Sequence, residues 1–205
     1  MGEPYELPMF PLGSVLFPSI VLPLHIFEER YRALARHLTA DDVEPEFGVV
    51  LIERGSEVGG EDVRTAVGCV ARVHEAAELP DGRWALVAVG VRPLRVERWL
   101  SDDPYPRAEV VDLDDVDDGG DWPPVESALR RALGLAAELG EARSPATVEL
   151  ADDPGLASNQ AAAIAPLGPL DQAAVLACRS VRGRIELLAE LLADQLVLLE
   201  ARLTG

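Results

Sequence analysis

The sequence predicts an α+β protein, in which a compact and partly closed β-barrel with one helix is followed by a helical region. Short apolar runs punctuated by Pro and Gly fill residues 5–113, and one segment with helical spacing interrupts them. Long amphipathic segments dominate from residue 124 onward. We therefore expect two domains, a β-rich domain over residues 1–118 and a helical domain over residues 119–205.

The β-rich part begins with two short apolar runs that are set off by proline. Leu7–Leu12 and Val21–Phe27 are expected as edge strands or strand starts, because proline cannot donate a hydrogen bond to a neighbouring strand. Apolar residues recur within Glu28–Leu38 at the spacing of one helix face, which predicts a helix there. Further strands are expected at Phe47–Ile52, Val63–Leu79, Trp84–Trp99 and Arg107–Leu113.

Turn residues predict how the two long strands are joined and shaped. The Pro-Asp-Gly turn in LPDGRW, residues 79–84, predicts a β-hairpin. A bend in its second strand is expected at Gly90 or Pro93. Arg54–Glu61 is rich in glycine and is expected to form a turn or loop.

The acidic segment 112–124 is expected to be a solvated linker. An EF-hand template that starts at Asp115 fails, because Gly119 takes a ligand position and prolines break the loop. Beyond this linker the sequence predicts helices, with Ser180 as the N-cap of the last one. Their expected bounds are Pro124–Leu139, Asp171–Cys178 and Ser180–Leu203.

Composition excludes several classes of function. The formal net charge of −18 disfavours binding to nucleic acids and to anionic membrane surfaces. All the basic residues are arginine, so no Walker A lysine, Schiff-base lysine or Ser–Lys dyad is available. Cys69 and Cys178 are expected to be reduced, which fits a cytoplasmic location. Neither a membrane span nor a signal peptide is expected.

No pattern of residues points to catalysis or to a cofactor. There is no G-x-S-x-G nucleophile elbow, and His25, His37 and His74 stand in ordinary structural contexts. No C-x-x-C, H-x-x-x-H or H-E-x-x-H metal motif occurs. We therefore expect a protein that is not an enzyme, with no catalytic residues, no metal and no cofactor.

The segment LPMFPLGSVLFPSIVLPLHIFEERYRALARHL, residues 7–38, resembles the start of the N-terminal substrate-binding domain of Lon proteases. That family opens with L-P-L-F-P-L, V-L-F-P and L-P-L-H-I-F-E-x-R-Y-R elements. Ser19 stands where the family often has glycine, which makes a left-handed turn there less comfortable, and Glu29 stands where proline is common. Because the ATPase and peptidase modules of Lon use lysines that this chain lacks, we expect a stand-alone form. The resemblance continues through residues 47–61, 67–100, 104–113 and 166–192.

This resemblance implies a PUA-like β pseudo-barrel followed by a C-terminal helical bundle. It also implies a non-catalytic module of protein quality control that binds unfolded polypeptides or a protein partner, such as an ATP-dependent protease. An apolar strand edge bounded by prolines can accept an extended peptide by β-augmentation. The candidate binding residues are Phe10, Pro11, Phe17, Pro18, His25, Phe27, Glu28, Arg30 and Tyr31.

Two alternative functions stay open at the level of sequence. A PUA-like barrel can hold a small-molecule effector, and an enclosed pocket of polar and apolar residues near Trp84 or Trp99 would support this function. The leucine-rich helix at 180–203 can act as a homo-oligomeric scaffold, although so broad a stripe is more typical of a helix buried among others. We expect a monomer or a weak homo-oligomer.

Overall fold

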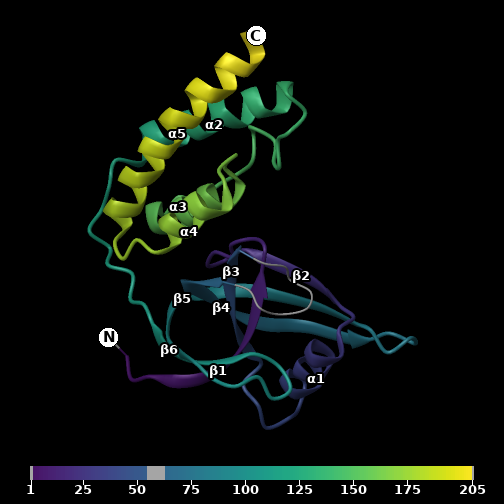
Figure 1. Cartoon of the computed structure of the whole chain (residues 1–205). Coiled ribbons are helices and arrows are strands. Elements are labelled where there is room, and N and C mark those ends of the chain that lie inside the picture. Colours follow the sequence, from purple (N-terminus) through teal and green to yellow (C-terminus); the bar gives the residue numbers. More distant parts are fainter. Residues whose placement is uncertain (1, 55–62, 205) are drawn as a thin grey trace. The chain divides into compact units, whose positions relative to one another are not determined.

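The computed structural model describes residues 2–54 and 63–204, and their contacts separate into two compact units divided between Asp114 and Asp115 (Figure 1). The prediction of a fold that combines α-helices with β-strands is confirmed. In the first unit the elements are β1 Tyr5–Leu12, β2 Val21–Ile26, α1 Glu29–Leu38, β3 Glu46–Arg54, β4 Val63–Glu78, β5 Trp84–Trp99 and β6 Arg107–Asp112. In the second unit they are α2 Trp122–Glu138, α3 Pro154–Ile164, α4 Pro169–Leu176 and α5 Val181–Thr204.

The strands of the described residues form one sheet in the order β2-β5-β4-β3-β1-β6. Because β6 pairs with β5 as well as with β1, the strands β5, β4, β3, β1 and β6 form a closed ring, and β2 is added outside it. β2 pairs with residues 84–89 of β5, whereas β6 pairs with residues 94–99 of the same strand. β1 and β3 run parallel, and the other pairs are antiparallel.

An apolar core fills the ring with side chains from alternate strand positions. Full burial of a large aliphatic side chain contributes about 1.5–3 kcal/mol, so this cluster is a main source of the unit's stability. Gly48 brings β3 close to the core, since a Cβ there would lie 2.5 Å from the sulfur of Met9. The buried members of the cluster are Leu7, Met9, Val50, Val70, Leu94, Ala108 and Val110.

The chain enters β2 through a tight turn against β5. Ser19 has a φ of 66°, and its N–H donates to the Gly90 oxygen at 2.7 Å. The N–H of Gly90 in turn donates to the Ile20 oxygen at 2.9 Å. A Cβ at Gly90 would lie 2.1 Å from the Phe17 oxygen, so glycine is required at this close approach. Ser19 therefore adopts the left-handed conformation, which is less favourable for serine than for the glycine that the family often has here.

Replacing Ser19 by glycine is expected to stabilise the protein by about 0.5–1 kcal/mol. A left-handed non-glycine residue costs roughly 1–2 kcal/mol, and the larger backbone entropy of glycine in the unfolded chain offsets part of that gain. Urea unfolding of the full chain measures the change. Ser14→Gly, at a nearby exposed bend without a positive φ, is the control and should be neutral or destabilising. Equal effects of the two variants would contradict a strained turn.

β4 and β5 form the predicted hairpin, and Figure 1 shows them extending together as a long ribbon. The turn is closed by the N–H of Leu79, which donates to the Arg83 oxygen at 2.7 Å, and Gly82 has a φ of 78°. A register shift leaves Val91 without a partner in β4. Val91 lies between Gly90 and Pro93, the two positions at which the sequence predicts a bend. Most of the glycine-rich loop predicted at Arg54–Glu61 lies outside the described residues.

The helices of the second unit pack around α5. α2 lies along α5, and α3 and α4 also contact it. The predicted N-cap is confirmed, because the Ser180 hydroxyl accepts a hydrogen bond from the Gly183 N–H at 3.1 Å. Most of the expected apolar stripe of this helix is buried, but Leu203 is exposed. Arg184 lies on the buried side of α5, where the sequence predicts only apolar side chains.

The acidic segment 112–124 spans the boundary between the two units, and its residues 114–121 are exposed, as expected of a solvated linker. It is also anchored in a way that the sequence does not predict, because Asp115 accepts hydrogen bonds from the buried guanidinium of Arg184. Asp118 likewise accepts one from the backbone N–H of Arg182 at 2.9 Å. Helix α3 has no counterpart among the predicted elements, because its run of alanines offers little contrast between an apolar and a polar face.

Candidate functional site

A hollow of about 220 Å³ lies between the end of β1, strand β2 and the start of α1. We call it the β2–α1 hollow. Its walls are mostly apolar and its rim carries an acid and a histidine, which is the usual composition of a binding site. The lining residues are Phe10, Leu12, Pro23, Leu24, His25, Ile26, Phe27, Glu28 and Tyr31.

Two stacked aromatic rings line the β2–α1 hollow, those of Phe10 and Tyr31, with their centroids 4.0 Å apart. The buried ring of Phe47 does not line the hollow, but its centroid lies 6.2 Å from that of Phe10. Phe27 differs from these three because 59% of its surface is exposed. Such exposure leaves a large apolar side chain available to a partner at the mouth of the hollow.

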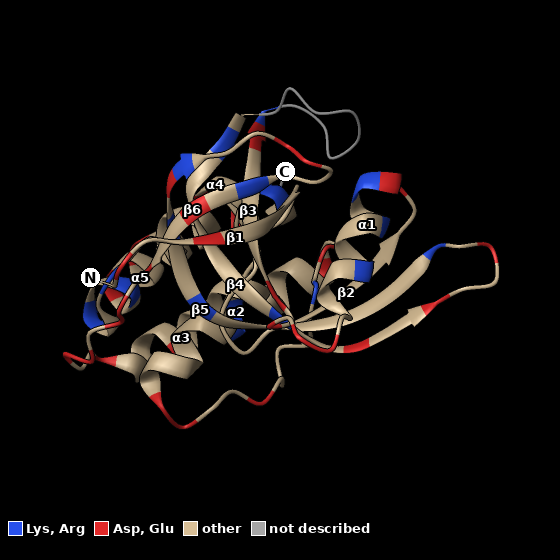
Figure 2. Ribbon diagram, turned by 90° about the horizontal axis from the view of Figure 1, so that it is seen from below, with Lys and Arg blue, Asp and Glu red and all other residues tan. Residues whose placement is uncertain are grey.

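A charged pair borders the hollow at the start of α1. The guanidinium of Arg30 lies 4.6 Å from the centroid of the Tyr31 ring, and its Nε donates to the carboxylate of Glu28 at 3.2 Å. Acidic and basic positions also lie next to each other along α1, as Figure 2 shows. The rim is therefore polar but close to charge-balanced, and the apolar wall is the distinctive surface.

The outer edge of β2 has no strand neighbour among the described residues. The N–H of Gly90 donates to the Ile20 oxygen, so Ile20 and Gly90 form a hydrogen-bonded pair. Hydrogen-bonded and non-hydrogen-bonded pairs alternate along antiparallel strands. From Val21 on, every second residue of β2 therefore directs its backbone N–H and C=O away from β5. Pro23 occupies such an outward position, where its missing N–H costs the sheet nothing. The backbone of His25 faces the same open edge, next to the β2–α1 hollow.

The structure brings together five of the nine candidate binding residues. Phe10, His25, Phe27, Glu28 and Tyr31 line the β2–α1 hollow, and the remaining four lie around or away from it. Arg30 contacts the ring of Tyr31, Pro11 and Phe17 are buried, and Pro18 is half-buried in the turn before β2.

A second cavity of about 590 Å³ opens near the start of β1. Five polar side chains, one from each strand of the closed ring, meet beside it, and we call them the five-strand network. Neither Trp84 nor Trp99, near which a pocket would support a small-molecule function, lines this cavity. The network consists of Tyr5, Glu46, Arg72, Arg92 and Asp112.

Arg92 is the centre of the five-strand network. Its guanidinium donates to Glu46 at 2.9 Å and to Asp112 at 2.7 Å, and it also reaches the Tyr5 hydroxyl at 3.1 Å. Arg72 donates to the same carboxylate of Glu46 at 2.7 Å. The Tyr5 hydroxyl donates to Asp112 at 2.6 Å, so the network connects every strand of the ring.

Burial and hydrogen bonding shift the acid–base properties of this network. Burial raises the pKa of Glu46, but hydrogen bonds from Arg92 and Arg72 outweigh it and hold the pKa below its usual value. Burial, followed by the hydrogen bond to Asp112, raises the pKa of Tyr5 to about 12. The sequence signals these positions only weakly, as single charged residues next to apolar runs, and sequence reasoning does not identify them as a group.

Other kinds of site are not formed by the described residues. Among these residues, no three His, Cys, Asp or Glu side chains are grouped to hold a metal ion. None of the helices within residues 2–54 and 63–204 combines the length and the apolarity that are required to cross a bilayer. His37 lies 5.9 Å from the ring of Tyr105, and His74 is exposed on β4.

Comparison with known proteins identifies the family. A family model described as the ATP-dependent protease La (LON) substrate-binding domain matches residues 6–194. The chain belongs to this family. The resemblance that residues 7–38 suggest is thereby confirmed, and it extends over both units of the structure.

The similar curated proteins are Lon proteases that are much longer than the region they share with this chain. Lon protease 2 of Myxococcus xanthus is 31% identical over 201 residues, which cover 92% of this chain and 24% of that protein. The Lon protease of Anaeromyxobacter dehalogenans is also 31% identical, over 92% of this chain and 23% of its own length. The chain spans about a quarter of the length of these curated relatives.

Solved structures of Lon N-terminal domains share the fold. The Lon N-terminal domain protein from Xanthomonas campestris has a TM-score of 0.67 and 28% identity, covering 91% of this chain and 98% of that one. The N-terminal domain of the Mycobacterium avium complex Lon protease has a TM-score of 0.58 at 15% identity, over 93% and 99% of the two chains. The second likeness concerns the fold alone.

Proposed function

We propose that this Lon-type substrate-binding domain is a non-catalytic module that binds extended apolar segments of polypeptides at the β2 edge. The observation that carries this proposal is the position of the open edge of β2 beside an aromatic hollow at which Phe27 is 59% exposed. An added strand gains main-chain hydrogen bonds from β2, and its alternate side chains turn toward the β2–α1 hollow. The edge gives affinity and the hollow gives preference for apolar side chains.

The same proposal covers the wider setting of the molecule. Unfolded polypeptides are the substrates, an ATP-dependent protease is the protein partner, and the role is protein quality control in the cytoplasm. The chain acts as a PUA-like barrel domain over 1–118 followed by a helical bundle domain over 119–205, in a monomer or a weak homo-oligomer. Membership of the Lon substrate-binding family supports this setting.

Phe27→Ser is expected to weaken binding of a chemically unfolded, fluorescently labelled polypeptide by about tenfold or more. Burying a phenylalanine side chain contributes about 1.5–3 kcal/mol, and Phe27 is exposed enough for its loss to leave the fold unchanged. Fluorescence anisotropy of the full-length chain measures the affinity. Val197→Ser removes an apolar residue of similar exposure, 66%, from α5 and is the matched control. Equal losses in both variants would contradict a specific site.

Strand addition at the edge of β2 is tested separately, by removing backbone N–H groups from His25 and from the ligand. His25→Pro removes an outward N–H, whereas Pro23 shows that the edge tolerates proline two residues earlier. An apolar peptide N-methylated at consecutive residues, so that neither of its edges can donate hydrogen bonds, should bind the native protein several-fold more weakly than the unmodified peptide. Undiminished binding of the methylated peptide would rule out strand addition at this edge.

A small-molecule effector is the second candidate function, and the 590 Å³ cavity beside the five-strand network favours it. Its volume is within the range of ligand pockets, and two of its lining side chains, Tyr5 and Glu46, have shifted pKa values. A metabolite that copurifies with the native chain and is detected by mass spectrometry would support this function.

A further inference from the structure

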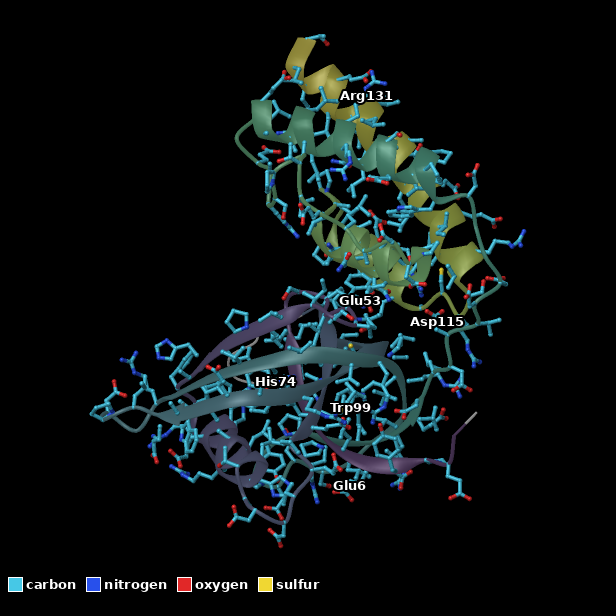
Figure 3. The ribbon with its side chains drawn as sticks, turned by 180° about the vertical axis from the view of Figure 1, so that it is seen from behind. Glu6, Glu53, His74, Trp99, Asp115 and Arg131 are labelled. Atoms are coloured by element: carbon cyan, nitrogen blue, oxygen red, sulfur yellow. The ribbon has the colours of Figure 1, made fainter. Side chains whose placement is uncertain are left out.

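The second unit contains a hollow that the proposed function does not use. It has a volume of about 290 Å³ and lies where the acidic segment after β6 meets the start of α3. Figure 3 labels Asp115 at the beginning of this unit. We call this cavity the acidic hollow. Its polar lining residues are Asp115, Asp117, Asp153 and Asn159.

The carboxylates of the acidic hollow exceed the positive charge that faces them. Asp115 is paired with Arg184, whose side chain is 1% exposed. Asp117 and Asp153 form no ion pair with any described residue. Neither of these two charges is therefore balanced by a cationic side chain at a partly enclosed surface, which favours a cationic occupant.

Asn159 provides a second and independent sign of a ligand. The residue is 6% exposed and lines the hollow, yet no described residue donates a hydrogen bond to its Oδ1. An unsatisfied buried polar atom costs about 1–3 kcal/mol, and structures rarely keep one without a reason. A group with N–H donors at the amide of Asn159 removes this cost.

The partial positive charge at the N-terminus of α3 does not exclude a cation from the acidic hollow. The start of α3 would repel positive charge if its N–H groups pointed freely at the hollow. The carboxylate of Asp153 instead accepts a hydrogen bond from the Leu156 N–H at 2.8 Å and caps the helix. The second oxygen of this carboxylate keeps its capacity to accept a hydrogen bond from a ligand.

The arrangement selects among cations. Among the described residues no three acidic side chains are grouped to hold a metal ion, so the acceptors are spread rather than convergent. A guanidinium offers five N–H donors in one plane and reaches separated acceptors, whereas an ammonium is a compact point charge. Leu156 and Val181 give the hollow an apolar wall for the methylene stem of such a group. We propose that the acidic hollow binds the arginine side chain of a polypeptide.

The test uses the full chain and short blocked peptides that lack apolar residues and so avoid the β2–α1 hollow. Gly-Arg-Gly should bind in calorimetric titrations several-fold more tightly than Gly-Lys-Gly, and the neutral isostere Gly-citrulline-Gly should not bind. N-butylguanidine supplies the same guanidinium and the same single charge without a peptide. Binding of the citrulline peptide as tight as that of the arginine peptide would overturn the proposal. Tighter binding of N-butylguanidine than of Gly-Arg-Gly would overturn a polypeptide source.

Matched variants locate the site. Asp117→Asn and Asp153→Ser should each weaken binding of Gly-Arg-Gly by about fivefold or more, and serine keeps the cap of α3. Asp152→Asn makes the same charge change at an adjacent exposed position and should leave the affinity unchanged. Equal weakening by Asp152→Asn would show general charge attraction and would overturn the site.

Asn159→Leu separates a ligand-binding role from a structural one. The variant removes the unpartnered Oδ1, so it should abolish binding of Gly-Arg-Gly while leaving the melting temperature equal to or above that of the native chain. A lower melting temperature with intact peptide binding would assign Asn159 to the packing of α3 and would overturn the proposal. Millimolar Mg²⁺ that displaces the peptide from the native chain would instead show a metal site.

Discussion

Replacing Asp115 by alanine is expected to lower the free energy of unfolding by about 3 kcal/mol, because it leaves a buried guanidinium without its counter-charge. This is the lower end for a buried pair, since 32% of the Asp115 side chain is exposed. The side chain of Arg184 is 1% exposed, and its closest contact is the carboxylate of Asp115 at 2.6 Å. Its other partners are neutral, the Ser158 hydroxyl at 2.8 Å and the Gly155 oxygen at 3.3 Å. Neither compensates the charge. Chemical unfolding followed by circular dichroism measures the loss.

Removing both charges should restore much of this stability. The double variant Asp115→Ala with Arg184→Met replaces the ion pair by apolar surface, and such exchanges are often neutral or stabilising. Asp121→Ala changes an exposed acid that makes no cap hydrogen bond at α2, and it is expected to shift stability by less than about 0.5 kcal/mol. If Asp115→Ala behaves like Asp121→Ala, water solvates Arg184 and the account of a buried ion pair is wrong.

The first 38 residues illustrate how far local pattern predicts this fold. Prolines set off β1 and β2, and the 3.6-residue spacing of Tyr31, Leu34 and Leu38 predicts α1. These signals are local in sequence. The same stretch contains five of the residues that line the β2–α1 hollow and were expected at a binding site, because β2 runs directly into the helix that forms the other wall.

What the sequence did not predict depends on pairs that are distant along the chain. Asp115 and Arg184 are 69 residues apart, and a charge inside an acidic run gives no sign of a buried partner. The five-strand network likewise needs the closure of β6 onto β5 before Asp112 meets Arg92. Helix α3 was missed for a local reason, since Asp153 and Pro154 mark its start but its alanines show no clear periodicity.

Replacing Arg92 by methionine is expected to lower the free energy of unfolding by about 2–3 kcal/mol, less than a fully buried pair because 30% of its side chain is exposed. The variant leaves Glu46 with Arg72 alone and Asp112 with the Tyr5 hydroxyl. Arg95→Met, at an exposed pair with Glu97 on the same strand, is the matched control and should cost less than about 1 kcal/mol. Equal losses would show that the network does not stabilise ring closure.

The five-strand network also predicts how stability depends on pH at both extremes. The pKa of Glu46 in the folded chain lies below its usual value, so its contribution is present above about pH 4.3 and is lost as the pH falls through the folded pKa. The pKa of Tyr5 is raised to about 12 by burial and then by the hydrogen bond to Asp112, so its contribution is present below about pH 10 and is lost as the pH rises toward 12. Glu46→Gln should flatten the acid side of a stability–pH profile, and Tyr5→Phe should flatten part of the alkaline side. Burial also raises the pKa of Cys69, so a residual alkaline loss is expected in Tyr5→Phe, whereas an unchanged alkaline slope would remove Tyr5 from the network's energetics.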